Sequence, residues 1–193
     1  MRRGNLIIVS GPSGAGKGTL VKGLVARVPD VWVSVSATTR TPRPGEREGV
    51  DYFFLTPQEF EKRVASGEFL EHATVHGNRY GTLRGPVTRR MNSGMQVVLE
   101  IDVQGAEQVK AAMPEAVLVG IVPPDQEELR RRIVGRGSES PAEIALRMKA
   151  AEKEIPLVEK YDYVIVNDDV SRATDELVGI VESLAEGKAE QPR

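Results

Sequence analysis

A glycine-rich segment near the N-terminus has the residue types and spacing that bind a polyphosphate. It follows the apolar stretch 6–9 directly and combines three spaced glycines with Lys17. Such glycines allow successive backbone N–H groups to turn toward one anion, and a helix beginning near Lys17 adds the positive end of its dipole. The Lys17 ammonium supplies a full charge for the terminal phosphates. The predicted phosphate-binding residues are Gly11, Pro12, Ser13, Gly14, Ala15, Gly16, Lys17, Gly18 and Thr19.

This loop departs from the usual pattern at one position. The residue after the lysine is ordinarily Ser or Thr, whose hydroxyl contacts Mg²⁺. Here it is Gly18, and the hydroxyl comes one position later at Thr19. We therefore expect Mg²⁺ to be held mainly by phosphate oxygens and water.

Length and composition limit the function classes. The chain has 193 residues, the size of one domain, and a formal net charge of −2, which gives no reason to expect a nucleic-acid partner. It contains no cysteine, which excludes disulfides and thiolate chemistry, and its two histidines argue against a zinc centre. Because no long apolar segment is present, we expect no membrane span or signal peptide and a cytoplasmic location.

Short apolar runs rich in β-branched residues alternate with stretches of helical spacing. The runs predict strands covered on both faces, and the alternation predicts a parallel α/β sheet. The predicted strands are 6–9, 31–35, 97–101, 117–122 and 163–166. The predicted helices are 17–28, 103–112, 125–135 and 142–155, with Ser140 as a cap before Pro141. Residues 37–94 interrupt this alternation with short strands and a hairpin around Gly77-Asn78, as expected of an insertion with its own small sheet.

The first part of this insertion is a basic loop. Arg40 and Arg43 flank a proline, and Tyr52 follows a turn. Two guanidinium groups and a phenol suit a phosphate monoester. A solvated basic loop is an equally good interpretation of the two arginines alone.

The phosphate loop and the block from Arg40 to Phe54 together resemble the guanylate kinase family, whose members phosphorylate GMP with ATP. The resemblance covers essentially the whole chain, through residues 164–169. It implies one domain: a five-stranded parallel P-loop sheet flanked by helices, with a mixed α/β GMP-binding insertion and a small helical lid. The implied segments are a core of 1–36, 95–129 and 151–186, an insertion of about 37–94, a lid of about 130–150 and a frayed tail of 187–193.

The same resemblance implies a GMP pocket lined by Ser36, Arg40, Arg43, Tyr52, Glu71, Tyr80, Thr82, Glu100 and Asp102. Arg40, Arg43, Tyr52 and Tyr80 would hold the phosphate. Glu71, with Ser36 and Thr82, would bind the base, which agrees with guanine chemistry: its N1–H and N2 amino group are adjacent donors that one carboxylate can accept. Without the resemblance, Glu71 is better interpreted as an exposed hairpin residue, and Tyr80 could also pack across strands.

Glu100 and Asp102 end a predicted strand two residues apart, so both carboxylates lie on one face at the carboxyl end of the sheet. The resemblance places them where GMP, the phosphates and Mg²⁺ meet. The alternative is that these acids cap the next helix. Thr19, Glu100 and Asp102 are therefore the candidates for contact with the metal, and none is assigned as a direct ligand.

Basic residues and one amide complete the predicted site. Arg132 and Arg136 are four apart and share a helix face if the helix persists, and Arg147 lies on the next helix. The resemblance implies a lid that brings these arginines to the ATP phosphates, where they join Lys17 as catalytic residues, and places Asn167 near the adenine. The alternatives are a solvated basic helix face and a turn at the end of a strand.

Together these features predict an enzyme of purine nucleotide metabolism that makes GDP and ADP from GMP and ATP with Mg²⁺, with dGMP as a further expected substrate. A kinase for another small phosphate would not need Glu71 with Ser36 and Thr82. Scaffold modules of similar fold that bind phosphorylated peptides typically have a degraded phosphate loop, whereas Gly16-Lys17 is intact here. The sequence assigns no oligomeric state.

Overall fold

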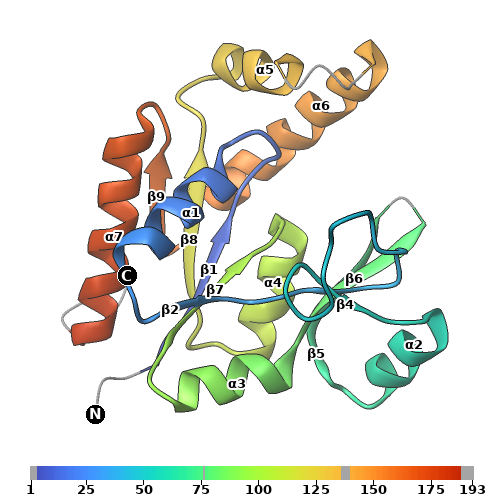
Figure 1. Cartoon of the computed structure of the whole chain (residues 1–193). Helices are drawn as coiled ribbons and strands as arrows, with labels where there is room; N and C mark the ends of the chain where they lie inside the picture. The colour runs from blue at the N-terminus through green and yellow to red at the C-terminus, as the bar shows by residue number, and fades with distance from the viewer. Residues whose placement is uncertain (1–3, 76, 136–139, 188–193) are drawn as a thin grey trace.

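A five-stranded parallel sheet forms the centre of the computed structural model, which describes residues 4–75, 77–135 and 140–187 (Figure 1). The strand order is β2-β7-β1-β8-β9, and each neighbouring pair is parallel. The strands are β1 (Leu6–Ser10), β2 (Val31–Val33), β7 (Gln96–Glu100), β8 (Val117–Val122) and β9 (Tyr163–Val166). The predicted fold class is confirmed, with β2 ending two residues earlier than expected.

Helices cover both faces of this sheet, which explains why its strands are apolar on both sides. In β1, Ile7 and Val9 pack in one cluster with residues of α1 (Lys17–Arg27) and α7 (Val170–Glu186). Leu6 and Ile8 point to the other face, toward α3 (Arg84–Asn92) and α4 (Val103–Ala112). All four side chains are at most 1% exposed, so β1 and the loop after it rest on a rigid support.

The insertion forms a second sheet with the order β4-β3-β6-β5, to the right in Figure 1. It contains β3 (Ala37–Thr38), β4 (Phe53–Phe54), β5 (Phe69–Val75) and β6 (Asn78–Leu83). The predicted hairpin is present as the antiparallel pair β5-β6. Helix α2 (Pro57–Ala65) covers one face, where the rings of Phe60 and Phe69 stack with centroids 4.4 Å apart. Both α2 and α3 were missing from the predicted helices, as was α7.

Two helices at the top of Figure 1 carry the predicted lid residues: α5 (Gln126–Val134) and α6 (Pro141–Val158). Ser140 caps α6 as predicted, in a capping box with Glu143. The helix continues past residue 155 in spite of Pro156, because fully buried Val158 packs in a cluster with Val103 and Val122.

The C-terminal helix α7 ends at the cap residue Gly187, which adopts a left-handed conformation. The remainder of the predicted frayed tail, residues 188–193, lies outside the described residues. In the part of the chain that the structure describes, no helix is long and apolar enough to cross a membrane.

Candidate functional site

The phosphate loop turns sharply where β1 ends, and its backbone requires glycine. Gly11 has φ 147°, and a Cβ there would lie 2.1 Å from the carbonyl oxygen of Ile121. Gly16 has φ 96° and precedes α1 without a side-chain cap. The first N–H groups of α1 are therefore available to an anion.

Lys17 is held over this loop by the loop's own carbonyl groups. Its Nζ donates to the carbonyl oxygens of Gly11 at 2.6 Å and Pro12 at 3.1 Å. The lysine lines a cavity of about 400 Å³ with Ser13, Gly14, Gly16, Gly18, Thr19, Lys22 and Glu100. Two ammonium groups beside a glycine loop make this cavity suited to a polyphosphate.

The carboxylate and hydroxyl oxygens in this cavity could contact a Mg²⁺ ion that takes most of its ligands from water and phosphate. A Cβ on Gly18 would lie 3.2 Å from Oε1 of Glu100, so the missing side chain leaves space that the carboxylate approaches. Thr19 lines the same cavity. The described residues contain no group of three or more His, Cys, Asp or Glu side chains that could hold a metal. Water and phosphate oxygens would have to supply the remaining ligands.

Two of the three predicted lid arginines contact the phosphate loop. Arg132 donates from Nη2 to the Asn167 carbonyl at 2.8 Å and from Nη1 to the Ala15 carbonyl at 3.4 Å. Arg147 donates from Nη1 to Oγ of Ser13 at 3.0 Å. Both side chains therefore lie beside the predicted phosphate loop. Arg136 lies outside the described residues.

Asn167 lies behind the phosphate loop and is 2% exposed. Its Nδ2 donates to the Ala15 carbonyl at 2.8 Å, which fixes the orientation of the amide. Its Oδ1 is buried and has no hydrogen-bond partner among the described residues. An amide oxygen without a partner could accept from an amino group such as the one on adenine. Asp169, which the alternative placed in a turn with Asn167, caps α7.

Glu71 is buried at 7% exposure, so its interpretation as an exposed hairpin residue is wrong. Thr82 Oγ1 donates to its Oε1 at 2.7 Å. Burial raises the pKa of Glu71, the Thr82 hydrogen bond opposes this, and the charge of Asp102 adds to the rise. Asp102 itself caps α4 by accepting the Gly105 N–H at 2.7 Å. The capping hypothesis for Asp102 is thus confirmed, and the same residue influences Glu71.

The predicted phosphate ligands of the insertion form an aromatic and cationic group. The guanidinium of Arg40 lies 5.2 Å from the centre of the Tyr52 ring, which is 6.2 Å from the Tyr80 ring in an edge-on arrangement. The Arg40 side chain is 14% exposed and pairs with Glu46, so most of its surface is shielded from solvent. Arg43 is exposed. Ser36 is half-buried directly before β3, where its carbonyl accepts the Phe53 N–H.

Glu100 and Asp102 have different neighbours in the structure, although the sequence placed both on one face of a strand. Glu100 approaches the phosphate loop at Gly18, whereas Asp102 lies beside Gly105, which is also next to Glu71. The strand ends at Glu100, so alternation no longer applies at Asp102.

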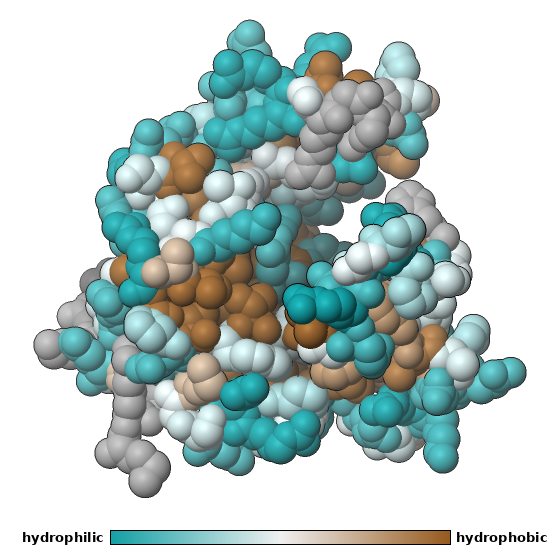
Figure 2. Space-filling model, in the orientation of Figure 1, coloured by the Kyte–Doolittle hydropathy of each residue, from teal (hydrophilic) through white to brown (hydrophobic). Residues whose placement is uncertain are grey.

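Figure 2 shows that the molecule is indented between the atoms of α5 and α6 and those of the small sheet.

Two carboxyl groups near the site were not predicted. Glu46 accepts from Arg40, and its position three residues after Arg43 in a basic loop is a signal that could have identified it. Glu154 of α6 is half-buried; burial raises its pKa, Lys17 opposes the rise and Asp102 adds to it. It is one of several acids on α6, and nothing in the sequence distinguishes it.

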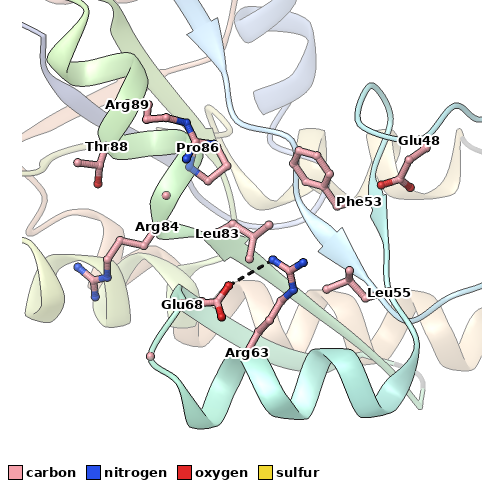
Figure 3. A pocket seen from close by; sticks show the side chains of 12 residues that line it. Glu48, Phe53, Leu55, Arg63, Glu68, Leu83, Arg84, Pro86, Thr88 and Arg89 are labelled. Carbon is pink, nitrogen blue, oxygen red and sulfur yellow. Dashed lines mark hydrogen bonds and ion pairs between the residues drawn. The ribbon is translucent and has the colours of Figure 1, made fainter.

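A further cavity of about 730 Å³ lies between α2, β4 and the start of α3 and contains none of the predicted site residues (Figure 3). Phe53, Leu55 and Leu83 line it, and Arg63 pairs with Glu68 across it at 3.3 Å. Because neighbouring strand residues point to opposite faces, the Phe53 side of β4 is the face away from Tyr52. This cavity is therefore separate from the predicted substrate site.

Comparison with known proteins agrees with this arrangement. The family model for guanylate kinase matches residues 3–184. A guanylate kinase of Clostridium perfringens (strain SM101 / Type A) is 51% identical over 179 residues, covering 93% of this chain and 83% of the relative. A guanylate kinase of Thermobifida fusca is 51% identical over 176 residues, covering 91% and 90%.

A solved structure of the same family also resembles this chain. The crystal structure of guanylate kinase from Anaplasma phagocytophilum superposes with a TM-score of 0.75 at 35% identity, covering 96% of this chain and 88% of that one. The phosphate loop, the insertion and the helices α5 and α6 all fall within the matched residues. This chain belongs to the guanylate kinase family.

Proposed function

We propose that this chain transfers the terminal phosphoryl group of ATP to GMP, releasing GDP and ADP. The observation that carries the proposal is the buried pair of Glu71 and Thr82. A buried carboxylate with a hydroxyl beside it is expensive to desolvate, and two adjacent N–H donors of a guanine edge would compensate it. Adenine sets an unprotonated N1 against the same carboxylate and would be rejected.

Each substrate has its own set of residues. The phosphate loop, 11–19, and Asn167 bind ATP. Ser36, Glu71 and Thr82 bind the guanine, while Arg40, Arg43, Tyr52 and Tyr80 bind the GMP phosphate. Asp102 influences the guanine-binding residues through its charge, which adds to the raised pKa of Glu71. Glu100 lies next to the ATP-binding residues, at Gly18 of the phosphate loop. Support for this division comes from the hydrogen bonds and ring contacts described above.

The reaction needs positive charge more than it needs a base. A phosphate monoester has a second pKa of about 6, so the attacking oxygen is already largely deprotonated at neutral pH. The barrier comes from bringing two polyanions into line. Lys17, Arg132, Arg136 and Arg147 offset this repulsion and stabilise charge on the transferring group. The two substrate sets fix the direction of attack.

Mg²⁺ accompanies ATP in this proposal, and Glu100 and Thr19 are the residues that would approach it. When bound, the ion neutralises charge on the phosphate oxygens. Asp102 is a weaker candidate, because its Oδ1 already accepts the Gly105 N–H. Use of dGMP and a cytoplasmic location stay predictions.

A coupled assay of ADP release across the nucleoside monophosphates tests the function. We expect rapid release with GMP, release with dGMP, and far slower release with AMP, CMP and UMP. Equal rates with AMP and GMP would exclude a guanine site. ADP release with none of them, together with binding of a phosphorylated peptide, would instead support a scaffold module.

We also expect substrates to make the protein more compact. The small sheet and helices α5 and α6 flank the indentation seen in Figure 2, and catalysis requires them to enclose the transferred group away from water. Small-angle scattering with and without a bisubstrate analogue should show a smaller radius of gyration in the complex. Identical scattering profiles would mean that a rigid cleft performs the reaction.

A further inference from the structure

Glu46 lies in the loop between β3 and β4 and holds the side chain of Arg40 with both of its oxygens. Arg40 donates from Nη1 to Oε2 at 3.0 Å and from Nη2 to Oε1 at 2.8 Å. Two parallel hydrogen bonds between a guanidinium and a carboxylate fix orientation as well as distance. The two side chains are 14% and 19% exposed, so this pair is shielded more than an ordinary surface ion pair.

The same carboxylate also binds the backbone of the second loop arginine. Oε2 accepts the N–H of Arg43 at 2.7 Å, and the N–H of Glu46 donates in turn to the Arg43 carbonyl at 3.0 Å. Glu46 therefore connects two points of a loop that has no regular secondary structure there. The Arg40 hydrogen bond and the Arg43 N–H lower the pKa of Glu46, which keeps it ionised at neutral pH.

The pair with Glu46 uses only one edge of the Arg40 guanidinium. Nη1 donates to Glu46 and to the Thr41 carbonyl at 2.9 Å, and Nη2 donates once to Glu46. The Nε–H and the second N–H of Nη2 form a second fork on the adjacent edge. No carboxylate among the described residues pairs with that fork. The guanidinium lies over the ring of Tyr52, and Tyr80 also interacts with it.

We infer that Glu46 is a positioning residue for the GMP phosphate, which it does not touch. It holds the Arg40 side chain and the Arg43 backbone so that the open fork of Arg40 faces the phosphate beside Tyr52 and Tyr80. The inference rests on the proposed function. The opposite interpretation is that Glu46 occupies Arg40 in place of the phosphate and is displaced by it. The bond to the Arg43 backbone and the open second fork favour positioning.

The two interpretations predict opposite effects of Glu46→Gln. The amide keeps one acceptor, loses the charge and turns an NH₂ group toward the guanidinium, so Arg40 is released. Positioning predicts GMP affinity lower by roughly tenfold or more, with the affinity for guanosine, which has no phosphate, unchanged. Displacement predicts tighter GMP binding. A role confined to loop stability would lower the affinities for GMP and guanosine together.

Calorimetric titration of the full chain with GMP and with guanosine decides between these outcomes. Glu48→Gln is the matched control, because Glu48 lies in the same loop and accepts the Phe54 N–H at 2.9 Å but lines the cavity of Figure 3. We expect the control to bind GMP like the wild type. Glu46→Asp, which keeps the charge on a shorter side chain, should recover part of the lost affinity.

Steady-state kinetics adds an independent measurement. In Glu46→Gln, we expect KM for GMP to rise while kcat at saturating GMP and KM for ATP stay within about twofold. Unchanged or tighter GMP binding, or an equal loss for guanosine, overturns the inference. If Glu46→Gln does not fold, the same titrations of Glu46→Asp decide by the same criteria. Failure of the proposed function is a separate result: the wild type would then release no ADP with GMP.

Discussion

Replacing Lys17 with alanine is expected to lower kcat by about 10²- to 10³-fold, the largest effect of any single substitution considered for this chain. Its Nζ lies over the phosphate loop against the carbonyls of Gly11 and Pro12. Lys22 of α1 lines the same cavity, but it is Lys17 that hydrogen-bonds to these loop carbonyls. Because charge on the transferring group rises toward the transition state, the loss should affect kcat more than the KM for ATP.

The fold should survive this change. The loop is also held by the close packing of Gly11 against Ile121 and by the N–H groups of Thr19 and Leu20, which donate to the Gly16 carbonyl. Lys160→Ala, which removes an exposed lysine that is not one of the predicted site residues, is the control for loss of a positive charge. Turnover and thermal unfolding of both variants are the measurements. Near-normal turnover of Lys17→Ala would show that the role assigned to Lys17 is wrong.

Much of the fold could be predicted from the sequence because its strands are buried on both faces. That requirement produces runs such as 6–9 and 117–122, which no surface strand would contain. Helix α7 was missed although its cap Asp169 and its final Gly187 are ordinary boundary signals. Helix α3 was missed because Gly85 and Pro86 near its start suggest a turn, while only the packing of Val87 under β1 and β7 shows its place.

The candidate site was predictable where local chemistry is distinctive and unpredictable where it depends on long-range contacts. Three glycines and Lys17 identify a phosphate loop within ten residues. The burial of Glu71 results from the pairing of β5 with β6 and from the approach of α4 at Gly105, 34 positions along the chain. Arg132 reaches Ala15 and Asn167 only because α5 packs on the loop. Hydrophobic periodicity contains no information about such contacts.

Glu71→Gln is expected to lower kcat/KM for GMP by about 10- to 200-fold, with little change in the KM for ATP. The amide oxygen can still accept from Thr82 Oγ1, but the NH₂ group would face a guanine edge that also presents donors. The wild-type kcat/KM for GMP should also fall as the pH is lowered through the raised pKa of Glu71, since a protonated carboxyl cannot accept both donors. The variant should lack the contribution of Glu71 to this pH dependence and keep only the contribution of the GMP phosphate, whose second pKa is about 6.

The same substitution should stabilise the folded protein at neutral pH. Burial raises the pKa of Glu71 above its unfolded value, so the folded state binds that proton more tightly than the unfolded state does. The contribution of this proton to the free energy of unfolding is fully present below the ordinary carboxyl pKa, and it is lost as the pH rises through the raised pKa of Glu71. Glutamine does not ionise and avoids this loss. The melting temperature of Glu71→Gln should therefore exceed that of the wild type increasingly from about pH 4 to neutral pH.

Thr82→Ala, which removes the hydroxyl but leaves the buried carboxylate, should be less stable than the wild type at neutral pH. The hypothesis is that Glu71 is retained for guanine recognition although its buried charge destabilises the fold. It would be wrong if Glu71→Gln used GMP normally, or if this variant were less stable than the wild type at neutral pH.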